Sequence, residues 1–364
     1  MSQYRARDVG LTIGRLPTGA LNAIVDVPGV RVGHVSLVSG EGPLRPGIGP
    51  VRTGVTAIWP HEGNPFAEKI PAAGFVLNGF GKTIGLAQFA ELGVIETPIL
   101  LTNTLNVPRV ADALIGYLVA RNPDLTSVNS VVGECNDSFL NDIRGRHVTA
   151  EHVFEALDEA SSGNVEEGCV GAGVGMSCYG FKGGIGTASR QLSFGDERFH
   201  LGVMVLSNFG AKAELRIDGV PVGRELGDDT GEAPAHGSIM MIVATNAPVD
   251  SRQLARIARR APLGMARTGS SAGHGSGDFV IAFSNGNRLP HRPSATVSTV
   301  RALAEDGPAI SLLFQATVEA TEEAVINSLF RAETVIGRDG NVREALPIDA
   351  VMTILRRYGH PLTF

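Results

Sequence analysis

The sequence has few cysteines and no long apolar run. Cys135, Cys169 and Cys178 are an odd number without Cys-x-x-Cys spacing, so neither a disulfide framework nor a zinc site is predicted. No segment approaches the ~18 apolar residues of a membrane span, and the first residues lack the apolar core of a signal peptide. We therefore expect a cytoplasmic protein with reduced thiols and no membrane partner.

Long basic runs are absent as well. The formal net charge is −6 at pH 7, which argues against nucleic acid or an anionic membrane surface as the main partner. The 46 glycines are spread through the chain without a repeat period. With 364 residues, 43% hydrophobic and 19% charged, the chain can bury a large core, as one domain or as two interlocked halves.

The glycine-rich stretch Gly79-Phe-Gly-Lys-Thr83 fits neither common phosphate-binding pattern. A P-loop would need a glycine at position 76, which is valine. The dinucleotide pattern counted from Gly79 would need one at position 84, which is isoleucine. The stretch is therefore predicted to be a structural turn that leads into a helix ending at Leu92.

Apolar segments with strand and helix periodicity alternate along the chain. Strands are expected at 54–59, 74–78, 98–104, 199–206 and 279–283, and helices at 109–120, 149–160, 310–330 and 347–358. Residues 22–34 are expected to form short strands broken by a Pro-Gly turn. One face of the first helix should be buried through Val110, Leu114, Ile115, Leu118 and Val119. Because no linker is long enough to separate domains, an α/β layered sandwich is predicted.

Ser238 stands where a polar loop becomes a buried strand. The turn-rich run 227–236 stops at Gly237, and an unbroken apolar segment follows Ser238. Cleavage of the Gly237–Ser238 bond would give Ser238 both a hydroxyl nucleophile and an α-amine of pKa roughly 7.7–8.0, which suits a general base. Glycine tolerates a strained peptide and lets the hydroxyl approach its carbonyl. Taken alone, a Gly-Ser pair is more often just the end of a loop.

Polar groups mark the ends of other predicted strands. They are Glu134 and Asn136 after one strand, Asn208 after another, and Ser276 and Asp278 before a third. An amide at a strand end is a standard oxyanion donor, although Asn and Asp side chains also close turns. His274 suggests a Ser-His-Asp arrangement, but nothing in the sequence fixes its partner.

With these residues in place, the sequence resembles the family of L-aminopeptidase/D-Ala-esterase-amidases and β-peptidyl aminopeptidases almost from end to end. The motifs that carry the resemblance are Asn22-Ala-Ile-x-Asp26-Val-Pro-Gly-Val-x-Val-Gly-His34, Thr97-Pro-Ile-Leu-Leu-Thr-Asn-Thr104, Gly180-Phe-Lys-Gly-Gly-Ile-Gly-Thr-Ala-Ser-Arg190, Gly237-Ser238 before an apolar strand, and Gly275-Ser-Gly-Asp278-x-x-Ile-Ala-Phe-Ser284. Each motif alone is modest. In this order they are specific, and they reverse the interpretation of Gly237-Ser238 as a loop end.

The resemblance implies an αββα sandwich, formed as an inactive precursor that cuts itself between Gly237 and Ser238. The products would be a larger chain (1–237) and a smaller chain (238–364) of one intertwined domain (1–364). Members of the family are oligomeric, often tetrameric, and need no metal or organic cofactor. We therefore expect a homo-oligomer that uses neither.

The resemblance also implies a role for each site residue. Ser238 would be the nucleophile in self-cleavage and in turnover, with its freed amine as the proton acceptor. Ser276 and Asp278 resemble the hydroxyl and the acid that hold this amine, and Asn208 resembles the oxyanion donor. Glu134 corresponds to the carboxylate that receives the substrate's ammonium group.

One position departs from the family pattern. Where relatives carry tyrosine as a second oxyanion donor, this chain has Asn136, whose amide is shorter and differently aimed.

Taken as a whole, the resemblance predicts a self-processing serine aminopeptidase or amidase that releases small N-terminal residues from short peptides, amides or esters. Alternatives are an acyltransferase or endo-acting amide hydrolase on the same fold, and a processing-incompetent homologue that binds a small molecule or serves as an assembly subunit.

Overall fold

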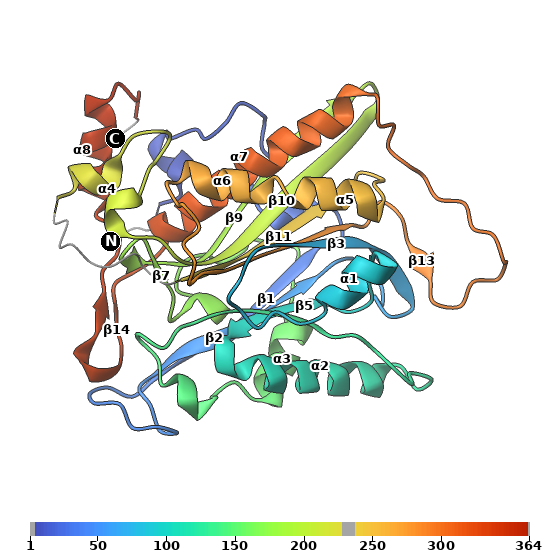
Figure 1. The fold of residues 1–364 in the computed structure, drawn as a ribbon, viewed down its shortest axis with the longest axis horizontal. Helices are drawn as coiled ribbons and strands as arrows, with labels where there is room; N and C mark the ends of the chain where they lie inside the picture. Colours follow the sequence, from blue (N-terminus) through green and yellow to red (C-terminus); the bar gives the residue numbers. More distant parts are fainter. Residues whose placement is uncertain (1–3, 228–236, 363–364) are drawn as a thin grey trace.

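Two β-sheets lie face to face in the middle of the molecule, and helices cover the outer face of each (Figure 1). The computed structural model describes residues 4–227 and 237–362. Most of the turn-rich run predicted before Gly237, residues 228–236, therefore lies outside the described residues. Within the two described ranges, no helix combines the length and the apolar composition needed to cross a membrane.

The smaller sheet has four strands, in the spatial order β1 (Arg31–Ser39), β2 (Val51–Trp59), β5 (Ile99–Asn103) and β6 (Val131–Cys135). The larger sheet has seven, in the order β13 (Leu289–Pro290), β3 (Glu68–Gly79), β12 (Gly277–Ser284), β11 (Ser238–Thr245), β10 (Glu197–Asn208) and β9 (Gly184–Phe194), with β4 (Val94–Ile95) paired to β3. Two short hairpins lie apart from these sheets, β7 (Ser177–Cys178) with β8 (Phe181–Lys182) and β14 (Val335–Ile336) with β15 (Val342–Arg343).

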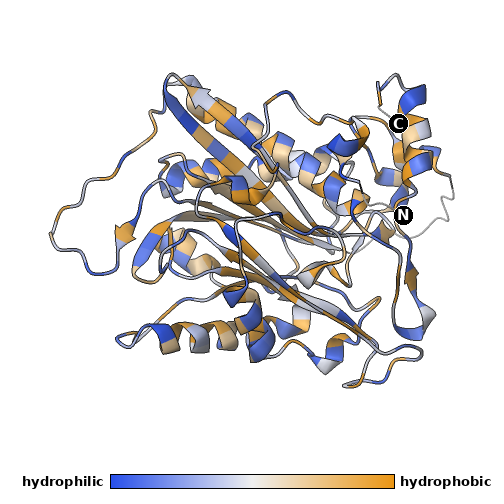
Figure 2. Cartoon of the chain, turned by 180° about the vertical axis from the view of Figure 1, so that it is seen from behind, coloured by the Kyte–Doolittle hydropathy of each residue, from blue (hydrophilic) through white to orange (hydrophobic). Residues whose placement is uncertain are grey.

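Helices form the outer layers. Those on the smaller sheet are α2 (Val107–Arg121) and α3 (Ala150–Asp158), and those on the larger sheet are α5 (Ser251–Ala258), α6 (Ala261–Arg267) and α7 (Pro308–Phe330). Three further α-helices complete the set that the structure describes, α1 (Leu86–Leu92), α4 (Val222–Glu225) and α8 (Ile348–Arg357). In Figure 2 hydrophilic and hydrophobic segments alternate along the helices, as expected for helices with one face on a sheet.

Three apolar cores separate the four layers. One lies between the two sheets and includes Ile99 and Leu101 of β5 with Met240 and Ile242 of β11. The other two lie between each sheet and its helices. The layer order confirms the predicted αββα sandwich. All residues of β11 and β12 are buried, because their sheet is covered on both faces, and this explains their unbroken apolar sequence.

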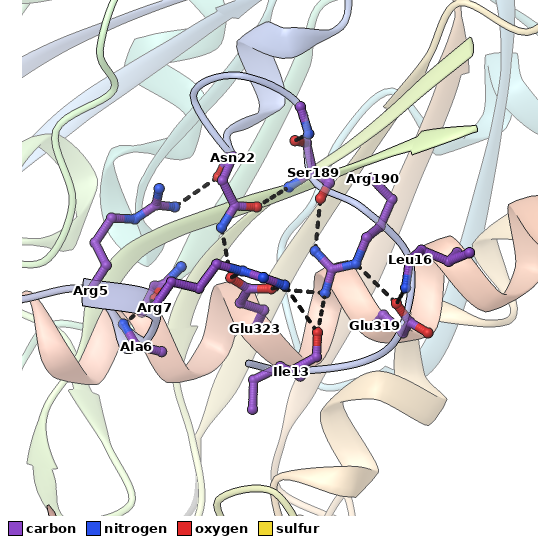
Figure 3. A network of polar contacts seen from close by, with 12 residues as sticks. Arg5, Ala6, Arg7, Ile13, Leu16, Asn22, Ser189, Arg190, Glu319 and Glu323 are labelled. Atoms are coloured by element: carbon purple, nitrogen blue, oxygen red, sulfur yellow. Dashed lines mark hydrogen bonds and ion pairs between the residues drawn. The ribbon is translucent and has the colours of Figure 1, made fainter. Parts of the chain in front are cut away.

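A buried polar network gives two of the sequence motifs a structural role (Figure 3). The guanidinium of Arg190, at the end of the glycine-rich motif, forms ion pairs of 3.0 and 2.8 Å with Glu319 and Glu323 of α7. Asn22 donates from Nδ2 to Glu323 at 2.6 Å and accepts from the backbone N–H of Ser189 at 2.9 Å. The network fastens the N-terminal segment and α7 to β9.

Two local predictions were wrong. Residues 24–26 form a 3₁₀ turn instead of a strand, since the Asp26 carboxylate accepts from the backbone N–H groups of Leu21 and Ala23 and closes the chain on itself. In α2, Ile115 and Val119 are 37% and 49% exposed. They lie about 100° around the helix from Leu114 and Leu118, which face the core.

Candidate active site

Ser238 is the first residue of β11, between the end of β10 and the start of β12. It pairs with Asn208 in the antiparallel direction and with Gly277 in the parallel direction. The side chain is buried, and apart from the Cys135 thiol that lies against it, Oγ has no described hydrogen-bond partner. A buried hydroxyl whose one polar neighbour is a weakly hydrogen-bonding thiol is costly and needs an explanation, and a reacting group is one.

The peptide bond before Ser238 is held closely by its neighbours. The Gly237 carbonyl oxygen accepts a hydrogen bond of 3.1 Å from the backbone N–H of Gly277. A Cβ atom at position 237 would lie 2.4 Å from the backbone oxygen of Asn208 and 2.6 Å from Cα of Phe209. Only glycine fits this place, since both obstacles are backbone atoms.

The Asn208 side chain connects three segments around Ser238. Its Oδ1 accepts from the backbone N–H of Ser177 at 2.8 Å, and its Nδ2 donates to the backbone oxygen of Asn136 at 3.0 Å. The amide has two N–H donors, and this bond uses one of them. The arrangement fixes the plane of the amide and presents it at the end of β10.

Asn136 is turned toward its own loop. Its Oδ1 accepts from the backbone N–H of Ser138 at 2.9 Å, which is an Asx turn, and the side chain is exposed. The residue still borders the cavity described below. Asn136 is connected to Asn208 through its backbone oxygen, which accepts a hydrogen bond from Asn208 Nδ2.

Glu134 comes from the other sheet, near the end of β6. It is 3% exposed. Its Oε1 accepts from the backbone N–H of Lys82 at 2.9 Å, and its Oε2 accepts from the Thr104 hydroxyl. No described lysine or arginine forms an ion pair with it. A buried carboxylate that is held by neutral donors can bind a cation supplied by a ligand.

Ser276 and Asp278 lie beside Ser238, at the start of β12. The Ser276 hydroxyl donates to Asp278 Oδ1 at 2.5 Å, and Asn78 Nδ2 donates to Oδ2 at 2.9 Å. Burial raises the pKa of Asp278, while these two hydrogen bonds act in the opposite direction. The pair therefore lies next to the backbone of Ser238, although neither side chain borders the cavity.

Ser238, Gly237, Asn208, Asn136 and Glu134 line one cavity of about 560 Å³. Its further lining comes from Phe80, Lys82, Thr104, Ser138, Phe139, Ser177, Gly180, Phe209, Gly210, Ala211, Gly275 and Arg343. The volume lies within the range of small-molecule sites. His274 does not line this cavity and so does not form a triad with Ser238, and among the described residues no group of His, Cys, Asp and Glu has the arrangement of a metal site.

Three residues were missed by sequence analysis. Thr104 binds Glu134, Asn78 binds Asp278, and Cys135 contacts Ser238 from β6. Burial and then the charge of Glu134 raise the pKa of the Cys135 thiol well above its usual range, while the Ser238 hydroxyl acts in the opposite direction. Each of the three stands at a predicted strand end, so a polar side chain at such an end was the available signal.

The buried carboxyl group of Asp137 should make the stability of the protein depend on pH. It is fully buried, its Oδ1 accepts from Asn141 Nδ2 at 3.0 Å, and burial raises its pKa from 3.8 to about 7. Because the folded-state pKa lies above the unfolded value, the stability that the protonated acid contributes is complete below about pH 4 and is lost as pH rises through about 7.

We therefore expect Asp137→Asn, which keeps an acceptor for Asn141 but cannot ionise, to gain stability relative to the wild type as the pH rises from about 4 to about 7. Urea unfolding at several pH values measures the difference in free energy of unfolding. Asp124→Asn, at an exposed ion pair with Arg292, is the control and should show no such trend. A difference for Asp137→Asn that stays constant with pH would contradict the assignment.

A family model and curated relatives match most of the chain. The model of peptidase family S58 matches residues 22–343. The chain is 42% identical to the β-peptidyl aminopeptidase BapA of Sphingosinicella microcystinivorans over 369 aligned residues, which cover 97% of this chain and 92% of the relative.

Solved structures share the fold over nearly the whole chain. The PH0078 protein from Pyrococcus horikoshii OT3 has a TM-score of 0.94 and 52% identity, covering 98% of this chain and 100% of that chain. The L-aminopeptidase D-Ala-esterase/amidase from Ochrobactrum anthropi, a prototype for the serine aminopeptidases with a variant of the Ntn hydrolase fold, has a TM-score of 0.90 and 38% identity, covering 98% and 99%. The chain belongs to peptidase family S58 and is an aminopeptidase.

Proposed function

We propose that the chain cuts itself before Ser238 and then releases small N-terminal residues from short peptides, amino-acid amides or esters through an acyl-enzyme on Ser238. The observation that carries the proposal is that Ser238 and Glu134, from different sheets, line the same cavity. One supplies a hydroxyl nucleophile, and the other a buried anion for the ammonium group that every unblocked peptide carries.

In the self-cleavage step, Ser238 Oγ attacks the carbonyl carbon of Gly237. The negative charge that develops on the Gly237 oxygen is stabilised by the N–H of Gly277, which already donates to this oxygen. The C–N bond breaks as the hydroxyl proton passes to the nitrogen, so that Gly237 is left on Oγ as an ester and the nitrogen of Ser238 becomes an amine. Water then hydrolyses the ester, which leaves a carboxylate on Gly237 and a free N-terminal serine.

In turnover, Glu134 binds the substrate's ammonium group while Ser238 Oγ attacks the substrate carbonyl. The freed α-amine, with an ordinary pKa of about 7.7–8.0, accepts the hydroxyl proton and passes it to the leaving amine. The second N–H of Asn208 Nδ2 stabilises the oxyanion, and Ser276 with Asp278 holds the α-amine. Water releases the acyl group and restores the hydroxyl.

Strand pairing supports a single intertwined domain after cleavage. β11 would be the first element of the smaller chain, and it pairs with β10 of the larger chain. β12 of the smaller chain pairs with β3 of the larger. The two products would therefore share one sheet and stay together. A homo-oligomeric state, a cytoplasmic location and activity without a metal are further parts of the proposal.

The variant Glu134→Gln tests whether Glu134 binds the substrate's ammonium group. The amide keeps the size of the side chain and an acceptor for the N–H of Lys82, but it loses the charge. We expect kcat/KM for alanine p-nitroanilide to fall about 10- to 100-fold, the effect of one charge-assisted hydrogen bond. Self-cleavage, which involves no ammonium group, should continue.

The control for this variant is Glu91→Gln, on the exposed side of α1 and outside the cavity, which should keep wild-type kinetics. N-acetylalanine p-nitroanilide should resist the wild type. Cleavage of this blocked substrate at a rate similar to the free one would favour an endo-acting amide hydrolase. Acyl transfer to an added amine in preference to water would favour an acyltransferase.

A further inference from the structure

The carboxylate of Glu134 is held in one orientation by donors from two segments. The backbone N–H of Lys82, in the turn after β3 of the larger sheet, donates to Oε1 at 2.9 Å. The Thr104 hydroxyl, directly after β5 of the smaller sheet, donates to Oε2. Because each oxygen has its own donor, rotation of the carboxylate would break both hydrogen bonds. The orientation of this group therefore depends on both contacts, and Thr104 supplies the one that comes from a side chain.

Thr104 is itself placed by a buried turn. Asn103 Oδ1 accepts from the backbone N–H of Asn106 at 3.1 Å, and Asn103 Nδ2 donates to the Thr53 hydroxyl at 2.8 Å. Asn103, Asn106 and Thr53 are each at most 1% exposed. The 3₁₀ turn Thr104–Asn106 then leads directly into α2. The hydroxyl of Thr104 is thus carried by a backbone that is fixed on both sides, as the supporting groups of an active site need to be.

The cavity is where a ligand can reach what remains of the Glu134 carboxylate. Glu134 is 3% exposed, and both Glu134 and Thr104 line the cavity that also contains Ser238. An ionised carboxylate has about four acceptor positions, and the two protein donors use two of them. An ammonium group bound to the others would be placed by the orientation of the carboxylate. That placement decides how the scissile carbonyl lies relative to Ser238 Oγ.

We propose that Thr104 is a positioning residue, whose hydroxyl orients the Glu134 carboxylate for the substrate's ammonium group. The proposal rests on the proposed aminopeptidase function. It gives Thr104 no proton transfer and no part in self-cleavage, which involves no ammonium group. Loss of the hydroxyl should therefore affect unblocked substrates alone, and only while Glu134 carries its charge.

Thr104→Val removes the hydroxyl and keeps the shape of the side chain. We expect kcat/KM for alanine p-nitroanilide to fall about tenfold, because Oε2 loses its donor and the bound ammonium group shifts. Thr104→Ser keeps a hydroxyl and should stay within about twofold of the wild type. Wild-type kinetics in Thr104→Val, or equal losses in the two variants, would overturn the proposal.

Thr97→Val is the matched control. Thr97 precedes β5, at the opposite end of this strand from Thr104, and it does not line the cavity. Its buried hydroxyl donates to the backbone oxygen of Pro98 at 2.8 Å. The same chemical change should therefore leave the kinetics at the wild-type level.

Two readouts separate positioning from a general structural role. When Thr104→Val is added to Glu134→Gln, kcat/KM for alanine p-nitroanilide should change by less than about twofold, because no charge is left to orient. p-Nitrophenyl propionate has the carbon skeleton of an alanyl ester without the ammonium group, and Thr104→Val should hydrolyse it at the wild-type rate. A tenfold loss in the Glu134→Gln background, or the same loss with the propionate, would show a structural defect and overturn the proposal.

A binding measurement separates this proposal from the aminopeptidase function. If the wild type hydrolyses no unblocked substrate, the proposed function fails, and calorimetry with L-alaninamide then tests Thr104 alone. Binding about tenfold weaker to Thr104→Val than to the wild type would support the positioning role. Equal binding to the two proteins, or binding to neither, would overturn it.

Discussion

Ser238→Ala is expected to give one uncut chain and to lower turnover of unblocked substrates by at least about 10⁴-fold. In the proposed mechanism the same hydroxyl cuts the chain and forms the acyl-enzyme. Its loss therefore removes both reactions and also leaves the α-amine locked in a peptide bond. A denaturing gel measures the first effect, and hydrolysis of alanine p-nitroanilide measures the second.

Two further variants separate chemistry from folding. Ser238→Cys keeps a nucleophile and should still be cut, at a reduced rate. Ser284 lies at the opposite end of β12, where it pairs with Thr245 of β11, and its hydroxyl donates to the backbone oxygen of Ala247. Ser284→Ala should therefore be cut and active. Full activity in Ser238→Ala would refute the role of the hydroxyl.

Gly237→Ala is expected to slow self-cleavage by at least about 100-fold, because the added methyl group would collide with backbone atoms. It would lie 2.4 Å from the oxygen of Asn208 and 2.6 Å from Cα of Phe209, neither of which can rotate away. The peptide bond must then shift, which moves its carbonyl from the N–H of Gly277 and from Ser238 Oγ. Misplacement of reacting atoms by about 1 Å is enough to produce such a loss.

The time course of cleavage in freshly purified protein, followed by mass spectrometry, measures this effect. Gly273→Ala is the matched control, because a Cβ atom there would meet nothing within 4 Å. It lies in the loop before β12 and should leave the rate unchanged. Wild-type cleavage in Gly237→Ala would mean that the closely held geometry around position 237 does not govern the reaction.

The layered fold was predictable where burial on both faces leaves a simple signal. β11 and β12 appear in the sequence as unbroken apolar runs, because helices and a second sheet cover their two sides. The pattern of residues 22–34 also predicted short strands, but residues 24–26 form a 3₁₀ turn instead. The Asp26 side chain closes this turn, and the backbone N–H of Ile24 donates to the Thr187 hydroxyl. Those partners depend on tertiary contacts that local sequence does not contain.

The candidate site was likewise predictable from the sequence only in part. Polar residues at strand ends singled out Ser238, Asn208 and Glu134 as candidates, the family resemblance implied their roles, and the structure places them around one cavity. Their supporting contacts cross between segments that are distant in sequence, as with Thr104 on Glu134. The orientation of Asn136 toward its own turn also follows from the loop conformation. Spacing in the sequence cannot specify such contacts, since they depend on how the two sheets are stacked.

The intact mass of purified wild-type protein tests the central claim most directly. We predict two masses, for residues 1–237 and 238–364, that remain associated under native conditions, with serine as the new N-terminal residue. A single chain of 364 residues that hydrolyses unblocked aminoacyl anilides at full rate would contradict the account, because activity would then not depend on a freed Ser238.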